Sequence, residues 1–225
     1  MLKLLRRWIR GGPDAGREAL QAWCESTGWA LRGIRDEPGF VIETRPGELA
    51  GRIEWGPSHR HYLGAHELRL RGELVMPADM HAVVMPKALM DTVESELFAQ
   101  AVGRVRTRID DTLPEEVRWL AVSPRLSGAL MGGLKVDYAA ASSHVPWLAH
   151  WVQGPLGDAL AARAKLPPAD APPFALIAHR GRLTLRVAMP DPDVAGVQAA
   201  MNLFDLALEQ ARLSPPPPDA EDDGG

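Results

Sequence analysis

Four histidines are the residues whose type and spacing could most directly bind a metal. His59 and His61 form a His-x-His pair, His66 follows five residues later, and His81 lies further along the chain. Alternate residues of a strand share a face, and three imidazoles with an open position can hold a catalytic zinc. However, no partner carboxylate is identifiable, and His59 follows a Gly-Pro-Ser turn. We predict no metal site at His59, His61 and His66; a metalloenzyme that also uses His81 is the alternative.

Other patterns typical of enzymes are incomplete. Stretch 66–70 begins like the HExxH motif of zinc proteases, but leucine stands where the second histidine must be. The Gly-rich stretch 128–135 differs from a phosphate loop, because its lysine is displaced and Val136 replaces the residue that binds magnesium. Neither GxGxxG nor GxSxG occurs. We therefore expect no catalytic residue and no cofactor.

Four carboxylates around Pro114 favour a simpler explanation than acid–base catalysis. Acidic side chains are stabilised near the positive end of a helix, so we interpret them as marking a helix start. They are Asp110, Asp111, Glu115 and Glu116.

Residues 1–10 separate into an apolar arc and a basic arc when they are placed on a helix. The absence of acids and the tryptophan on the apolar side are typical of a helix that lies at a membrane interface. Packing against the protein's own core or a second copy is the other interpretation, since so short a helix is marginal alone. The candidate interaction residues here are Arg6, Arg7, Trp8, Ile9 and Arg10.

A second candidate interaction surface is the pair Trp147 and Trp151. They are four residues apart and therefore share one face of a predicted helix. Aromatic residues at this spacing usually belong to the core; an exposed face would instead be a partner-binding patch.

Composition excludes some classes of protein. The chain has 225 residues, with 25 basic against 29 acidic side chains and a net charge of −4, which argues against nucleic-acid binding. Twenty-one of the 25 basic residues are arginine, a bias typical of a GC-rich bacterial genome.

The single cysteine, Cys24, excludes an intrachain disulfide and fits a reducing compartment. No run of 18 apolar residues occurs, and residues 1–10 do not resemble a signal peptide. We expect a cytoplasmic protein, peripheral at the inner membrane if residues 1–10 bind lipid.

Periodicity predicts an α+β fold. Residues 65–76 alternate leucine with charged side chains, which predicts a central strand with one buried face. We expect this strand to be the fourth of an antiparallel five-stranded meander, backed by helices over 14–26 and 87–102. A short strand at 119–122, a helix from 146, a hairpin turning at Arg180-Gly181 and a helix over 194–211 would form a second, smaller layer.

The predicted domain organisation has four parts. A basic amphipathic segment (1–12) precedes a helix, meander and covering helix (13–110). A second α+β part (111–213) either forms a domain of its own or joins the first. A proline-rich acidic tail (214–225) is expected to be disordered.

These features favour a non-catalytic binding, scaffold or adaptor protein. We expect it to act through contacts with an unidentified protein partner or with itself, and not with nucleic acid. An anionic membrane surface is a further candidate partner for residues 1–10.

Overall fold

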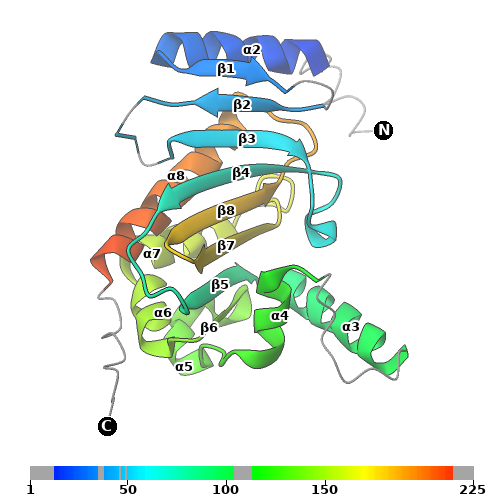
Figure 1. Ribbon diagram of the computed structural model, residues 1–225, viewed down its shortest axis with the longest axis vertical. Coiled ribbons are helices and arrows are strands. Elements are labelled where there is room, and N and C mark those ends of the chain that lie inside the picture. The colour runs from blue at the N-terminus through cyan, green and yellow to red at the C-terminus, as the bar shows by residue number, and fades with distance from the viewer. Residues whose placement is uncertain (1–12, 35–37, 46, 49, 104–112, 215–225) are drawn as a thin grey trace.

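The computed structural model describes residues 13–34, 38–45, 47–48, 50–103 and 113–214 (Figure 1). Residues 1–10, including Arg6, Arg7, Trp8, Ile9 and Arg10, lie outside them. The helices are α2 (Pro13–Thr27), α3 (Lys87–Gly103), α4 (Glu115–Val122), α5 (Gly128–Met131), α6 (Val145–Trp151), α7 (Gly154–Ala164) and α8 (Val194–Leu213), with 3₁₀ turns η1 (His61–Leu63) and η2 (Gly132–Val136).

One antiparallel sheet contains every strand of the described residues. The strands are β1 (Ala30–Gly33), β2 (Phe40–Glu43), β3 (Arg52–Pro57), β4 (His66–Glu73), β5 (His81–Pro86), β6 (Tyr138–Ser142), β7 (Phe174–His179) and β8 (Arg182–Ala188). Their spatial order is β1-β2-β3-β4-β8-β7-β5-β6. The predicted α+β class, with an antiparallel sheet backed by helices, is confirmed.

The predicted meander is correct for β1 to β4 and wrong for the fifth strand. The β7–β8 hairpin lies between β4 and β5, so β5 pairs with β6 and β7 instead of β4. The physical reason is burial: Ala82, Val83, Val84 and Met85 are all fully buried, so β5 needs cover on both faces and a neighbour on each side. Because the hairpin and β6 join this same sheet, the later elements do not form a separate layer.

Two local predictions have opposite outcomes. The hairpin turns at Arg180-Gly181 as expected, and both residues have positive φ (49° and 71°), the backbone geometry of a type I′ turn. Residues 119–122, in contrast, are the end of helix α4 and not a strand. Short apolar runs do not distinguish helix from strand, whereas Pro114 and the acids after it mark a helix start.

The main core lies between the sheet and the helices α2, α6, α7 and α8, which lie along one face (Figure 1). The alternation of β4 directs Leu68 and Leu70 into this core, and both are fully buried. Helix α8 begins where the Asp193 carboxylate accepts a hydrogen bond from the Gly196 N–H (2.7 Å). The helix forms over the range expected from the sequence, and its buried residues are Val197, Ala200, Leu203, Phe204, Ala207, Leu208 and Ala211.

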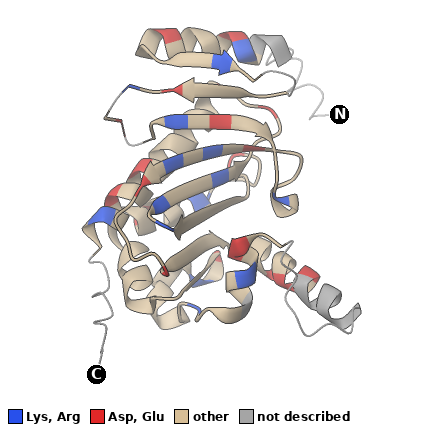
Figure 2. Ribbon diagram, in the orientation of Figure 1, with Lys and Arg blue, Asp and Glu red and all other residues tan. Residues whose placement is uncertain are grey.

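The opposite face of the sheet has two different halves. Over β5, β6 and β7 it is apolar, and Met90 and Val93 of α3 and Val117 and Leu120 of α4 pack on it. Over β3, β4 and β8 it carries charged side chains, and helices α3 and α4 lie beside this half (Figures 1 and 2).

Candidate functional site: an arginine face on the sheet

Arginines from three adjacent strands gather on the half of the sheet beside α3 and α4. Since side chains alternate between faces, the residues of β4 next to Leu68 and Leu70 point away from the core. The same alternation on β3 and β8 gives one cationic surface; the blue bands of Figure 2 mark the positions of basic residues along these strands. We call this surface the arginine face; its members are Arg52, Arg69, Arg71, Arg182 and Arg186.

Strand register places like charges directly opposite one another. Arg52 of β3 pairs with Arg71 of β4, and Arg69 of β4 pairs with Arg186 of β8. Like charges at directly opposed positions destabilise a sheet, so these guanidinium groups need anions among them.

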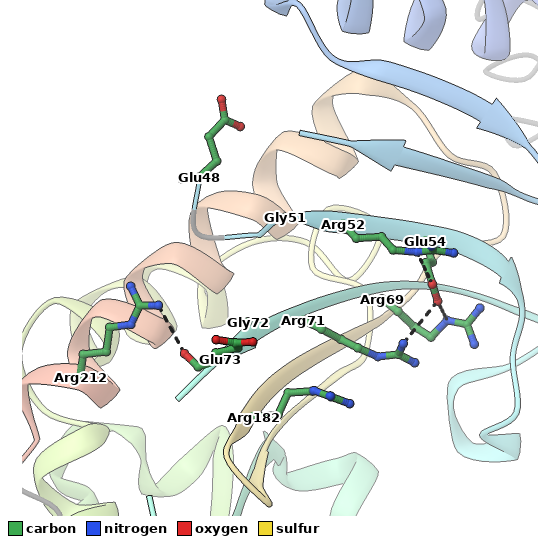
Figure 3. A pocket seen from close by; sticks show the side chains of 10 residues that line it. All are labelled: Glu48, Gly51, Arg52, Glu54, Arg69, Arg71, Gly72, Glu73, Arg182 and Arg212. Atoms are coloured by element: carbon green, nitrogen blue, oxygen red, sulfur yellow. Dashed lines mark hydrogen bonds and ion pairs between the residues drawn. The ribbon is translucent and has the colours of Figure 1, made fainter. Parts of the chain in front are cut away.

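Glu54 is the first of two glutamates that supply this negative charge. One of its carboxylate oxygens lies 2.7 Å from Arg52 Nε, and the other lies 3.6 Å from Arg69 Nε and 3.7 Å from Arg71 Nη1 (Figure 3). A single carboxylate is therefore shared by three guanidinium groups.

Glu67 is the second, and it is fully buried. Its Oε1 accepts a hydrogen bond from Arg186 Nη1 (2.6 Å) and lies 3.8 Å from Arg69 Nη1. Its Oε2 has no hydrogen-bond partner among the described residues. The two guanidinium groups lower the electrostatic penalty of burying this charge.

A pocket of about 490 Å³ opens at one end of the arginine face, where β3 and β8 begin and β4 and α8 end. Five arginines and three glutamates line it, an excess of two positive charges in a chain of net charge −4. Arg212 of α8 reaches over the end of the sheet and donates to the Glu73 carbonyl oxygen (3.3 Å; Figure 3). Arg182 forms no ion pair with another described residue.

The excess positive charge of the site affects the pKa of Arg71, which lies in its middle. Partial burial lowers the pKa of its guanidinium, and the charges of Arg69, Arg186 and Arg182 lower it further, against the opposing effect of Glu54. An additional anion in the pocket would relieve this repulsion. The arrangement is suited to binding carboxylates, because a guanidinium group can donate two parallel hydrogen bonds to one carboxylate.

A buried ionic cluster lies between α4 and the β3–β4 connection. The Glu116 carboxylate accepts hydrogen bonds from Arg60, through both Nε and Nη2, and from the Tyr62 hydroxyl (2.6 Å). Burial and the Glu116 charge raise the pKa of Tyr62, so the phenol stays protonated and donates. The cluster holds α4 beside the arginine face.

Two histidines contact the other side of α4, which rests on the sheet through Trp119. The rings of His81 and His179 each lie 4.6 Å from the Trp119 ring. His81 Nε2 is 2.6 Å from the Ser123 hydroxyl oxygen. Burial is the main cause that lowers the pKa of both histidines; Arg180 lowers that of His179 further. In the opposite direction, a hydrogen bond to the Asp79 backbone and the Asp79 charge raise the pKa of His81, and the Glu115 charge raises that of His179.

We expect the free energy of unfolding to fall as the pH is lowered through the pKa of these histidines. Their folded-state pKa values lie below the ordinary value of 6.5, so the unfolded chain binds more protons below that pH. Urea denaturation between about pH 7.5 and about pH 5.5 measures the loss. The double variant His81→Gln/His179→Gln should flatten this pH dependence. An unchanged slope in that variant would contradict the assignment.

The histidines considered as metal ligands are placed apart. His59 is exposed, His61 Nε2 lies 2.9 Å from Glu96 Oε2, and the His66 ring stacks on Trp55 at 5.1 Å. His81 belongs to the Trp119 cluster. Among the described residues, no three or more histidine, cysteine, aspartate or glutamate side chains are grouped to hold a metal ion.

Trp147 and Trp151 lie in the core, so they form no exposed partner-binding face. Only 3% of Trp147 and none of Trp151 is exposed, and their rings are 5.0 Å apart. The helix α6 that carries them is enclosed between β6 and α8.

Cys24 is a buried free thiol, and burial raises its pKa, as expected for an inert cysteine.

The arginine face was not identified from the sequence. A signal was present, since arginines recur every second residue at Arg69 and Arg71 and every fourth at Arg182 and Arg186. That pattern also fits an ordinary solvated face. Only the pairing of β4 with β8 turns two separate patterns into one cationic surface.

Comparisons with known proteins add little to this geometry. No protein-family model matches the chain, and no curated protein matches it. Among solved structures, the crystal structure of the mycobacterial trehalose monomycolate transport factor A, TtfA, is similar with a TM-score of 0.48 and 10% sequence identity. The similarity covers 89% of this chain and 97% of that chain. A likeness this distant supports no conclusion about function.

In the described part of the chain, no helix has the length and apolar character needed to span a bilayer.

Proposed function

We propose that this protein is a non-catalytic bacterial adaptor whose arginine face binds an acidic segment of a partner protein. The observation that supports this most is the charge of the pocket: five arginines against three glutamates, in a protein that is acidic overall. The pocket is thus a local exception to the charge of the molecule.

Carboxylates are the occupant best matched to this site. The arginine face already binds carboxylates, because Glu54 and Glu67 each contact more than one guanidinium group. Nucleic acid and anionic membranes are extended surfaces of high charge, and a net charge of −4 disfavours approach to either. A short acidic peptide contacts only the positively charged pocket, so it is repelled less by the net negative charge of the rest of the protein.

The geometry also predicts how binding divides among the arginines. Arg69 and Arg186 are largely buried and hold Glu67, so they position the site. The Arg71 side chain is 40% exposed, and Arg182 is exposed. We assign direct contact with the partner to these two.

We also propose a cytoplasmic location, because a chain with a single cysteine fits a reducing compartment. The protein would meet the partner segment there. Peripheral attachment through residues 1–10 remains an additional hypothesis. Co-sedimentation of the full chain with anionic vesicles, compared with a chain beginning at Gly11, tests it. Salt-sensitive binding that is lost on truncation would support attachment; equal background for both would contradict it.

Fluorescence anisotropy of a labelled octaglutamate peptide at low and physiological salt tests the adaptor proposal. We expect the double variant Arg71→Ala/Arg182→Ala to raise the Kd about tenfold, because two partly exposed ion pairs contribute about 0.7 kcal/mol each. Arg32→Ala is the matched control: Arg32 lies on the same sheet face but on β1, where it pairs with Glu43 at 3.2 Å. The control should leave the Kd unchanged.

Two results would overturn the proposal. One is an equal Kd for wild type and the double variant. The other is absence of octaglutamate binding combined with binding of duplex DNA or anionic vesicles, which would assign the arginine face to a different class of partner.

A further inference from the structure

The chain leaves helix α8 directly beside the pocket. Arg212, in the last turn of α8, lines the pocket and donates to the Glu73 carbonyl oxygen (3.3 Å). Two residues later Ser214 is buried, and both its N–H and its hydroxyl donate to the Gln210 carbonyl oxygen, at 3.0 and 2.8 Å. Ser214, the last described residue, is therefore held in place two residues after a residue that lines the pocket.

The sequence that follows is opposite in charge to the pocket. Residues 215–218 are prolines, and four acids come next: Asp219, Glu221, Asp222 and Asp223. An extended chain spans about 3.3–3.6 Å per residue, so these acids can reach roughly 15–30 Å from Ser214. Adjacent strands are about 4.8 Å apart, so β8 and β3 lie well within that reach.

We propose that the acidic segment 219–223 occupies the arginine-lined pocket of its own chain and competes there with the partner. The competition rests on the proposed function, whereas occupation of the pocket does not. The excess of two positive charges in the pocket favours the segment. A short tether gives it an effective concentration in the millimolar range, so even weak carboxylate–guanidinium contacts keep the pocket mostly occupied.

Competition from segment 219–223 sets a minimum affinity that a partner segment needs in order to bind. A partner segment must displace the protein's own carboxylates, so short or weakly charged peptides are rejected and longer acidic segments are accepted. Salt should weaken the internal and external contacts alike, because both are ion pairs at a partly exposed site.

Neutralising the segment in the full chain tests the competition. We expect the variant Asp219→Asn/Glu221→Gln/Asp222→Asn/Asp223→Asn to bind octaglutamate about tenfold more tightly than wild type, as removal of a tethered competitor predicts. The matched control neutralises four exposed acids elsewhere, which changes the net charge equally and should leave the Kd near that of wild type: Glu18→Gln, Asp91→Asn, Asp158→Asn and Asp170→Asn.

A second measurement detects occupation of the pocket without any added ligand. A nitroxide label on Gly224→Cys should broaden the side-chain NMR signals of Arg71 and Arg182 in the full chain. The buried Cys24 is protected from the label. Neutralising the four acids of the segment should remove the broadening.

The outcomes separate this inference from the proposed function. If wild type and the neutralised variant bind octaglutamate equally and no broadening occurs, the segment does not occupy the pocket and only the adaptor proposal survives. If broadening occurs but neither protein binds octaglutamate, the internal contact holds and the adaptor proposal fails.

Discussion

Replacing Trp151 with alanine is expected to lower the free energy of unfolding by about 3–5 kcal/mol. The side chain is fully buried, and its Nε1–H donates to the Ala207 carbonyl oxygen of α8 (2.8 Å). The substitution leaves a large cavity between α6 and α8 and removes the hydrogen bond that joins them. A loss of this size is a large share of the stability of an ordinary domain.

Urea denaturation followed by circular dichroism measures this loss. Trp151→Phe keeps most of the buried volume and should be destabilised much less than the alanine variant. Leu213→Ala is the control, because Leu213 is 74% exposed and should change stability by less than about 0.5 kcal/mol. A loss below about 1 kcal/mol for Trp151→Ala would contradict the placement of this residue in the core.

Replacing Glu116 with alanine is expected to cost about 3–5 kcal/mol, the loss typical of removing one partner of a buried ion pair. The Glu116 side chain is 3% exposed and that of Arg60 is 22% exposed. Without the carboxylate, the Arg60 guanidinium stays largely buried without its counter-ion, and the Tyr62 hydroxyl loses its acceptor. Tyr62→Phe removes a single hydrogen bond and should cost about 1 kcal/mol.

Chemical denaturation of the three proteins checks this order. Asp91→Ala, which removes an exposed carboxylate of α3, serves as the control and should be nearly neutral. If Glu116→Ala were as stable as this control, the buried cluster would contribute nothing to holding α4 on the sheet.

Most local elements of the fold follow from the sequence, because they depend on neighbouring residues. The two-residue alternation around Leu68 and Leu70 predicts strand β4, and the Arg180-Gly181 turn predicts the β7–β8 hairpin. The position of that hairpin between β4 and β5 depends on contacts between residues more than ninety positions apart. Periodicity contains no information about such pairing.

The candidate site was harder to predict for a related reason. Histidines and tryptophans stand out in a sequence, but in this fold His66 and His81 stack on tryptophans and Trp151 fills the core. Arg71 and Arg182 look like ordinary surface residues until strand register brings them to one pocket. A surface formed by three strands becomes visible only when their order is known.

The most direct test of the central claim is to locate the binding surface by NMR. Octaglutamate is titrated into ¹⁵N-labelled protein, and the Nε–Hε signals of the arginine side chains are followed. We predict that Arg52, Arg71 and Arg182 shift together with one saturation curve, while Arg32 stays unchanged. Shifts confined to arginines outside β3, β4 and β8 would contradict the assignment of the arginine face as the binding surface.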